Sequence, residues 1–197
     1  MKSNTRNALG KTAVFSLASL PFLDGLWRIN SGTRLGGNPV ETLEHLSGEW
    51  AIYLLLATLA ITPARQLLGW RWPLKVRRML GLFSAFYVAL HIACYLWLDL
   101  GFAWDEVWRE LTGRPTITVG AVAALGMTLL ALTSPKIAVR KLGRRWVPLH
   151  RSVYLVAVLA VVHVAWKGKD GDEVALLYGV LLIALLLPRF GTVLKRG

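Results

Sequence analysis

The sequence contains only one cysteine, Cys94, among 197 residues. A single thiol cannot form an intramolecular disulfide, a CxxC redox motif or a thiolate metal cluster. Nucleotide-binding and hydrolase signatures are also missing, because the chain has no Walker loop, no GxGxxG after a strand, no HExxH and no GxSxG. No polar segment is long enough to form a nicotinamide-binding domain. The sequence therefore excludes the common soluble enzyme classes that these motifs define.

Apolar residues are abundant instead, at 55% of the chain, and the mean hydropathy is +0.49. Both values lie outside the usual range for a soluble domain. A helix that crosses a bilayer needs about 20 apolar residues, and the second stretch reaches that length only with its flanks, from Leu46 to Pro63. No segment shows the ten-residue alternation of a barrel strand. We therefore expect an all-α integral membrane protein, a six-helix bundle that forms a single domain over residues 1–197. Its apolar stretches are Thr12–Trp27, Trp50–Ile61, Met79–Leu98, Ile117–Thr133, Leu149–Trp166 and Val174–Leu187.

Charge is distributed unevenly between the two sides of these stretches. If the amino terminus is cytoplasmic, most of the 23 Lys+Arg fall on the inner side, and every acidic residue except Asp24 falls on the outer side. The positive-inside rule then places both termini in the cytoplasm, with an even number of spans. The excess of basic over acidic residues is thus explained by membrane topology, so we expect no nucleic-acid partner. The inner basic residues are Lys2, Arg6, Lys11, Arg65, Arg71, Lys75, Arg77, Arg78, Lys136, Arg140, Lys141, Arg144, Arg145, Arg151, Arg189, Lys195 and Arg196.

An internal repeat links two histidines within the apolar stretches. The interval from Pro63 to His91 equals the interval from Pro135 to His163, so the two segments align without a gap. This spacing predicts a duplicated helical hairpin, spans two and three repeated as spans four and five. Both histidines then lie roughly 18 to 20 Å from the cytoplasmic charge layer, at about 1.5 Å per residue. Two imidazoles at one depth could face one another across a pseudo-two-fold axis.

Ionisable side chains within a membrane are costly and mark functional sites. One alternative is that His91 and His163 are neutral and only form hydrogen bonds within the bundle. A bare metal ion would require more protein ligands, whereas porphyrin supplies four of the six that haem iron takes. We therefore predict that His91 and His163 are axial ligands of haem.

His150 is the third histidine of the candidate site, and it precedes His163 in the same apolar stretch, near the cytoplasmic face. It could ligate a second haem, but its repeat-related position holds Arg78. The interval between His150 and His163 corresponds to a rotation of roughly 220° in an ideal helix, so a bulge or kink would be needed to align the two imidazoles. A flavin or quinone contact, or an ordinary interfacial histidine, are the alternatives for His150.

Other polar residues have two interpretations each. Arg77 and Arg78 are either topology charges with snorkelling side chains or anchors for a haem propionate or flavin phosphate. Asp24 is expected to pair with Arg28 on a helix, with a proton relay as the alternative. His45 is expected to be interfacial, with a ligand role as the alternative.

The outer loop Asp99–Arg114 combines acidic residues with Trp104 and Trp108. It is either a docking surface for a basic partner or a short amphipathic helix that lies on the lipid interface.

Several of these segments together resemble the MsrQ family, haem-binding membrane subunits of a bacterial periplasmic methionine sulfoxide reductase system. The similarity extends over nearly the whole chain from about Asn38 to Trp166. The MsrQ family in turn resembles the ferric reductase and NADPH oxidase transmembrane domain. The segments that carry it are Asn38–Gly48, Leu56–Pro63, Arg77–Gly81, the His91 segment, Arg114–Pro115 and Leu149–Ala160 with His163.

The resemblance implies a ferric reductase-like haem domain in the inner membrane, with haem b and, as a further candidate cofactor, FMN. It implies electrons from the quinone pool or a cytoplasmic flavin reductase, and delivery to a separate periplasmic molybdopterin subunit, MsrP, which repairs oxidised methionines. The chain itself would then lack a substrate-reducing site. The oxidase relatives carry two histidines on each ligand helix, whereas the third span here offers only His91. A stand-alone ferric or cupric reductase, and a non-haem transporter or assembly scaffold, are the alternatives.

Overall fold

The computed structural model describes residues 2–32, 35–167 and 172–194. Within these ranges the regular secondary structure is helical and no strand occurs. The all-α membrane fold expected from the sequence is therefore confirmed. The chain divides into two compact units, Met1–Phe102 and Ala103–Gly197. Of the basic residues in the topology argument, Lys195 and Arg196 lie outside the described residues, as do the side chains of Lys2, Arg6 and Arg189.

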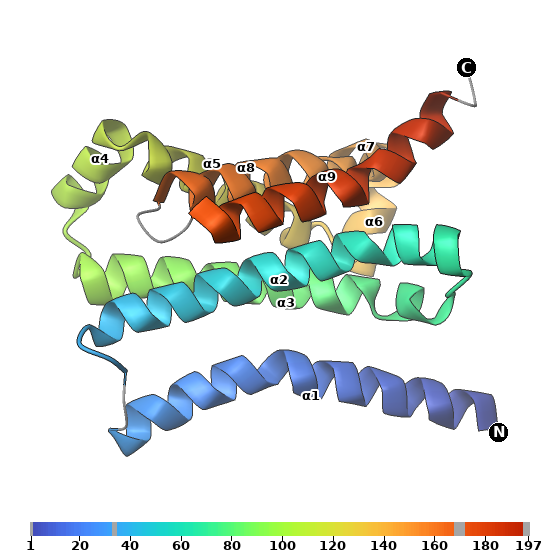
Figure 1. The fold of residues 1–197 in the computed structure, drawn as a ribbon, viewed down its shortest axis with the longest axis horizontal. Coiled ribbons are helices and arrows are strands. Elements are labelled where there is room, and N and C mark those ends of the chain that lie inside the picture. Colours follow the sequence, from blue (N-terminus) through green and yellow to red (C-terminus); the bar gives the residue numbers. More distant parts are fainter. Residues whose placement is uncertain (1, 33–34, 168–171, 195–197) are drawn as a thin grey trace. The chain divides into compact units, whose positions relative to one another are not determined.

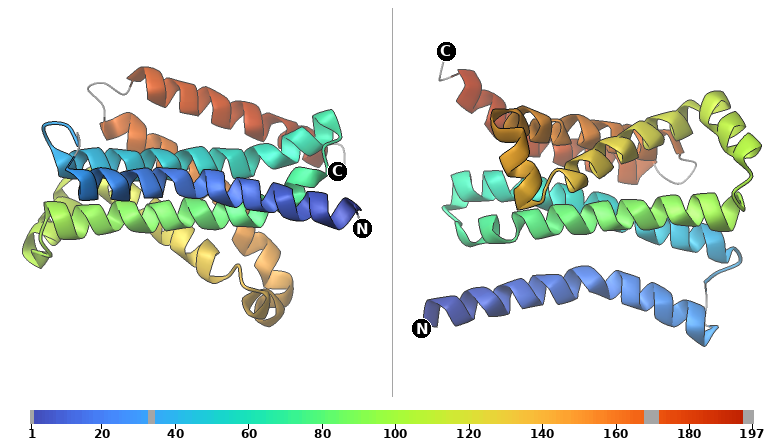
Figure 2. Two further views of the ribbon diagram at one scale, coloured as in Figure 1. Left: turned by 90° about the horizontal axis from the view of Figure 1, so that it is seen from below. Right: turned by 180° about the vertical axis from the view of Figure 1, so that it is seen from behind.

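The first unit is a helical hairpin with a third long helix beside it. Its elements are α1 (Lys2–Ser31), α2 (Pro39–Leu68), the short 3-10 helix η1 (Trp72–Lys75), α3 (Arg77–Ala93) and the π-helical η2 (Cys94–Asp99). α2 and α3 form the main packing contact of this unit. α1 runs along the hairpin in Figures 1 and 2.

Both ends of α2 follow from its sequence. The Asn38 side chain accepts a hydrogen bond from the Glu41 amide at 3.3 Å, and Pro39 occupies the first turn, where its missing N–H costs nothing. Gly69, at a φ of 68°, ends the helix in a left-handed cap. The expectation that this span ends at Pro63 was wrong for the helix itself, which continues through the proline to Leu68. Membrane helices tolerate such a proline because neighbouring groups satisfy the freed carbonyl.

The interface between α2 and α3 holds the most deeply buried side chains of the unit. Leu59 and Ser84 are fully buried and Tyr87 is 1% exposed. The Ser84 hydroxyl donates to the carbonyl of Ala51 at 2.7 Å, which satisfies this buried polar group within the interface. This packing fixes the rotation of α3 against α2, and it therefore also fixes the direction in which His91 points.

The second unit repeats the hairpin and adds helices at its ends. It contains α5 (Pro115–Leu132) packed on α8 (Val153–Lys167), with α9 (Asp172–Leu194) against α8 and α4 (Trp104–Gly113) against α5. The connection between α5 and α8 consists of α6 (Lys136–Leu142), η3 (Gly143–Arg145) and α7 (Trp146–Arg151).

The two hairpins α2–α3 and α5–α8 have the predicted repeat relationship. Each pairs a long helix with the helix that carries its histidine, in the same register as the sequence repeat. They differ at the repeated proline. Pro63 lies inside α2, whereas Pro135 caps the start of α6, beyond the end of α5.

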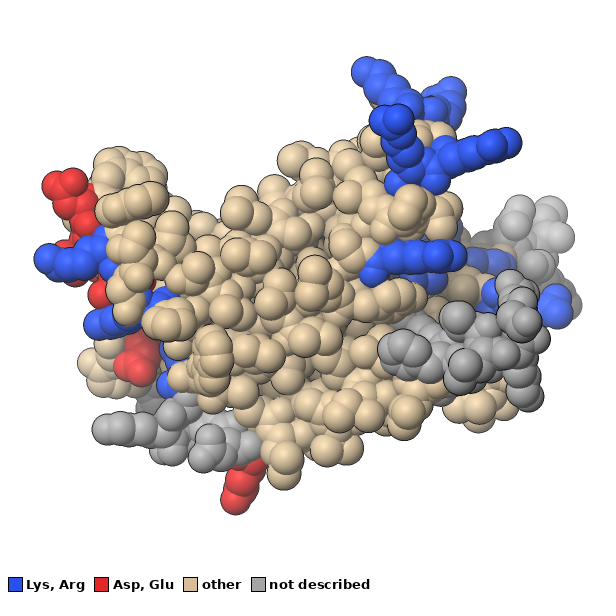
Figure 3. All heavy atoms as spheres, turned by 90° about the horizontal axis from the view of Figure 1, so that it is seen from above, with Lys and Arg blue, Asp and Glu red and all other residues tan. Residues whose placement is uncertain are grey.

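Four helical segments are long and apolar enough to cross a membrane, namely Pro39–Leu68, Arg77–Asp99, Pro115–Leu132 and the run Lys136–Lys167. They contain spans two to five of the sequence analysis. The first and sixth predicted spans lie in α1 and α9, of 30 and 23 residues. Figure 3 shows charged side chains at the two ends of the face drawn, with uncharged residues between them. This distribution is typical of a protein with an apolar belt in a bilayer.

Candidate functional site

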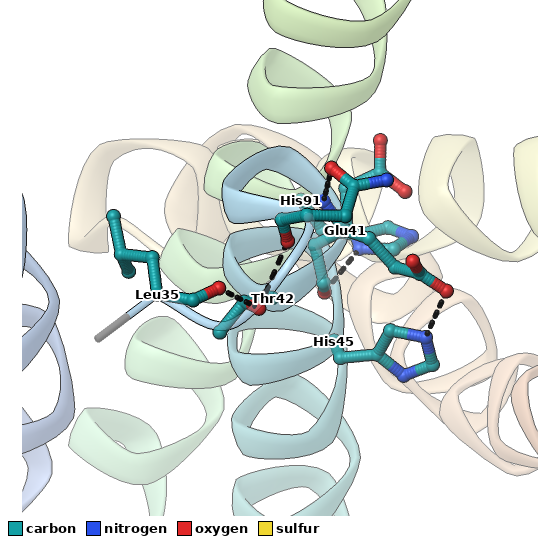
Figure 4. A network of polar contacts seen from close by, with 7 residues as sticks. Leu35, Glu41, Thr42, His45 and His91 are labelled. Atoms are coloured by element: carbon teal, nitrogen blue, oxygen red, sulfur yellow. Dashed lines mark hydrogen bonds and ion pairs between the residues drawn. The ribbon is translucent and has the colours of Figure 1, made fainter.

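His91 lies in the last turn of α3, directly before the π-helical η2. Its Nδ1 contacts the backbone carbonyl oxygen of Glu44 on α2 at 3.0 Å, and Figure 4 shows this contact near the start of α2. A carbonyl only accepts hydrogen bonds, so Nδ1 carries the hydrogen and the neutral ring presents its lone pair at Nε2.

His163 repeats this arrangement in the second unit. Its Nδ1 contacts the carbonyl oxygen of Thr116 on α5 at 2.9 Å. In both hairpins the histidine and the residue that supplies the carbonyl are 47 positions apart. The repeat that the sequence indicated from two prolines and two histidines therefore extends to the hydrogen bond that orients each imidazole.

A glycine lies against each imidazole ring. A Cβ built on Gly48 would come within 3.3 Å of Nδ1 of His91, and one built on Gly120 within 2.6 Å of Nδ1 of His163. These glycines also occupy equivalent positions in the two copies of the repeat. The ring of each histidine thus lies over the bare backbone of the opposing helix.

These two histidines have the donor chemistry that haem iron requires. A metal-ligating imidazole donates its other N–H to a carbonyl or carboxylate, which fixes the tautomer and raises the basicity of the ligating nitrogen. His91 and His163 both show this outer hydrogen bond, and both are part-buried in helices that can cross the membrane. Among the described residues, no three His, Cys, Asp or Glu side chains gather at one place to hold a bare metal ion.

His150 has a different environment, on α7. The Thr133 hydroxyl donates to the carbonyl of Leu129 at 2.7 Å, so its oxygen is placed to accept from Nε2–H of His150 at 3.1 Å. Trp146 stacks on the imidazole with a centroid distance of 4.1 Å. The helical run is interrupted at Ser152, between α7 and α8. An interruption thus lies between His150 and His163, as an alignment of their two imidazoles would require.

Arg77 and Arg78 are the first two residues of α3, which has no side-chain cap at its start. Arg77 is half-buried and Arg78 is exposed. The free amides at a helix start attract anions, and two guanidinium groups beside them add positive charge. Both arginines thus lie at the amino-terminal end of α3.

The remaining polar residues follow the simpler of their two interpretations. Asp24 forms an ion pair with Arg28 one turn away on α1, at 2.8 Å, as expected. His45 is half-exposed near the start of α2, with Nε2 at 3.8 Å from a carboxylate oxygen of Glu41, as Figure 4 shows.

The outer loop Asp99–Arg114 contains the amphipathic helix α4. Glu106 forms an ion pair with Arg109, and Glu110 forms one with Arg114. The hydrogen bond that Arg109 donates to the Glu106 carboxylate raises the pKa of the Arg109 guanidinium above its ordinary value. Both of these glutamates are thus paired within the same segment. Trp104 and Trp108, one turn apart, are 66% and 67% exposed.

Gly48 and Gly120 were not predicted from the sequence as parts of the site. The repeat relates their positions in the sequence, so a full comparison of the two hairpins would have found the pair. It would not have shown that each glycine contacts an imidazole, because that contact depends on how two helices pack. The carbonyls of Glu44 and Thr116 carry no sequence signal, since every residue has one.

Comparison with known proteins gives a consistent result. The family model for the ferric reductase like transmembrane component matches residues 47–161. A Rhodospirillum rubrum protein named protein-methionine-sulfoxide reductase heme-binding subunit MsrQ is 43% identical over 192 residues, which cover 97% of this chain and 92% of that protein. Proteins of the same name from Azospira oryzae and Bordetella pertussis are 47% and 42% identical. The alignments cover 90% and 92% of this chain, and 76% and 90% of those proteins. The chain therefore belongs to the MsrQ family of ferric reductase-like membrane proteins.

Proposed function

We propose that this protein is a haem b-binding electron-transfer subunit of the bacterial inner membrane, with both termini in the cytoplasm. The observation that carries the proposal is the matched geometry of His91 and His163. Each is a part-buried imidazole whose Nδ1 meets a backbone carbonyl of the partner helix in its own hairpin. Membership of a family whose curated relatives are named heme-binding subunits supports the same role.

In this proposal His91 and His163 are axial ligands, and the whole chain, residues 1–197, acts as a single haem domain. Haem iron supplies one-electron chemistry when it is bound, by alternating between the ferric and ferrous states. The carbonyls of Glu44 and Thr116 keep each imidazole in the tautomer that offers Nε2. The chain binds and orients the cofactor, and we propose no substrate-reducing site within it.

The electron donor would be the quinone pool or a cytoplasmic flavin reductase, and the acceptor a periplasmic molybdopterin-containing reductase like MsrP that repairs oxidised methionines. The names of the relatives support a partner reductase, since they describe one subunit of a methionine sulfoxide reductase. Arg77 and Arg78 would anchor a haem propionate or the phosphate of FMN at the cytoplasmic side. His150 would ligate a second haem or contact the flavin or quinone.

An absorbance spectrum of the detergent-purified protein tests this function. We expect a Soret band and the low-spin spectrum of bis-histidine haem b, because two imidazoles saturate the axial positions. His91→Ala and His163→Ala should each abolish the low-spin signal, and His45→Ala, at a half-exposed histidine, should leave it intact. A variant at position 91 or 163 that keeps the full low-spin spectrum would remove that residue from the ligand set. Colourless wild-type protein would support a transporter or scaffold instead.

A second candidate is a stand-alone ferric or cupric reductase, which the matched family model favours by its description. This activity would not require a partner protein. Reduction of a ferric chelate by the purified, pre-reduced protein alone, at a rate above its reduction of a periplasmic partner, would favour this candidate.

A further inference from the structure

Each imidazole shares its carbonyl acceptor with a glycine amide. In a regular α-helix, the carbonyl of one residue accepts from the N–H four residues later. The carbonyl of Glu44 therefore faces the amide of Gly48, and it also contacts Nδ1 of His91 at 3.0 Å. To reach that oxygen, the ring must pass over the α-carbon of residue 48.

The same geometry occurs in the second hairpin, where Gly120 lies one helical turn after Thr116. Nδ1 of His163 reaches the Thr116 carbonyl at 2.9 Å. In a helix the Cα–Cβ bond tilts toward the amino-terminal end, so a side chain at the glycine position would cover this carbonyl. In each hairpin the carbonyl is accessible to an imidazole because the residue one turn later, Gly48 or Gly120, has no side chain to cover it.

The distances show how little room remains. A Cβ on Gly120 would lie 2.6 Å from Nδ1 and 2.7 Å from Cε1 of His163, which is closer than real Cβ atoms approach other heavy atoms. A Cβ on Gly48 would lie 3.3 Å and 3.4 Å from the same atoms of His91. The contact at Gly48 is tight, but it requires a much smaller shift of the His91 ring than the contact at Gly120 requires of His163. The two positions therefore differ in how strictly they require glycine.

Backbone conformation does not explain these two glycines. Both lie inside helices, and neither is among the glycines with positive φ. Glycine inside a helix destabilises it by roughly 0.5–1 kcal/mol relative to alanine. The space that each glycine leaves for an imidazole is a local reason for its presence.

We propose that Gly48 and Gly120 are positioning residues for the two haem ligands. Their missing side chains admit each imidazole to the carbonyl that holds its Nδ1–H, and thereby keep the ring in the tautomer that would offer Nε2 to haem iron. The inference rests on the proposed function, because it assigns the glycines a role only if His91 and His163 ligate haem.

Alanine substitutions at the two glycines test this role, with two matched controls. Gly126→Ala lies on the same helix as Gly120, and its Cβ would meet Cγ2 of Val156 on α8 at 2.7 Å. This control creates an equally close contact between α5 and α8 without involving a histidine. Gly179→Ala adds a Cβ that meets nothing within 4 Å. The readouts are haem affinity, the g values of the low-spin ferric signal in electron paramagnetic resonance, and the midpoint potential.

Gly120→Ala should weaken haem binding by about 10-fold or more, the usual effect of losing an outer partner of a metal ligand. The haem that remains should have shifted g values, because the plane of the His163 ring turns. Gly48→Ala should retain haem and show a smaller shift of the g values. Gly126→Ala should keep wild-type g values in whatever haem it binds, and Gly179→Ala should match the wild type in every readout.

Wild-type g values and haem affinity in Gly120→Ala would overturn the role assigned to the glycines. They would leave the proposed haem function standing, because the wild-type protein would still bind low-spin haem. Equal shifts of the g values in Gly126→Ala and Gly120→Ala would also overturn it, since general packing would then explain both. If Gly120→Ala does not fold, Gly48→Ala decides, and an unshifted signal there would count against the proposal. Wild-type protein without low-spin haem would defeat the proposed function itself.

Discussion

Tyr87 on α3 donates its phenolic hydrogen to the carbonyl of Ala18 on α1 at 2.7 Å, and the phenolic oxygen of Tyr87 accepts a hydrogen bond from the amide of Phe22 at 3.1 Å. In a regular helix that amide and that carbonyl would bond to each other. The hydroxyl is thus inserted into the hydrogen-bond ladder of α1, next to Pro21. A proline and an inserted side chain are two common causes of helix bending, and Figure 1 shows α1 bent along its length.

We predict that Tyr87→Phe lowers the free energy of unfolding by about 1–3 kcal/mol, the cost of leaving buried backbone groups unsatisfied. The loss should be local to α1. Hydrogen exchange should accelerate at Phe22 and its neighbours, while peptides of α5 and α8 serve as the internal control. Unchanged exchange at Phe22 would show that the hydroxyl does not hold α1 to the hairpin.

His150 should matter less to haem binding than His91 or His163. Its Nε2–H is placed to donate to Thr133, which leaves Nδ1 as the nitrogen with a lone pair. We expect His150→Ala to keep most of the haem, with a shifted midpoint potential or slower reduction by the donor. Thr133→Val should reproduce part of that shift, because it removes the hydroxyl that is placed to accept from His150 and leaves the imidazole in place. Complete loss of haem in His150→Ala alone would show that the histidines are ranked wrongly.

Arg77 and Arg78 should respond differently to lysine, which keeps the charge but loses the planar, bidentate fork. Arg77 is half-buried, so Arg77→Lys should reduce electron flow and cofactor occupancy more than Arg78→Lys does. Arg71→Lys, at an exposed position in the preceding turn, is the matched control. Full activity in both variants would show that the two arginines serve only as positive charges that set the membrane topology.

α4 should lie on the lipid interface through Trp104 and Trp108, because Glu106 and Glu110 are already paired with arginines. A spin label on Trp104→Cys, in a Cys94→Ala background, should be more accessible to membrane-soluble oxygen than to an aqueous relaxing agent. Arg109→Cys, on the opposite face, should show the reverse preference. Aqueous accessibility at both positions, followed by protection on addition of a basic partner, would favour the docking surface instead.

Local patterns in the sequence correctly indicated the membrane class and the helical secondary structure. Hydropathy and helix period are properties of neighbouring residues, so they identified the helices that contain spans two to five. The same reasoning was wrong where it ended a helix at Pro63, because one lost hydrogen bond does not stop a helix that is well packed on α3. The ion pair between Asp24 and Arg28 was predictable because both residues lie on one turn.

Patterns along the chain are sufficient to identify an all-α membrane protein with a repeated hairpin and a histidine at the same place in each copy. The tertiary structure alone decided what each imidazole touches. His91 and Gly48 are far apart along the chain, and so are His163 and Gly120. Whether such pairs meet depends on the rotation and depth at which α2 packs on α3 and α5 packs on α8. Buried side chains such as Ser84 and Tyr87 set that packing in the first hairpin, and no periodic pattern along a single helix encodes it.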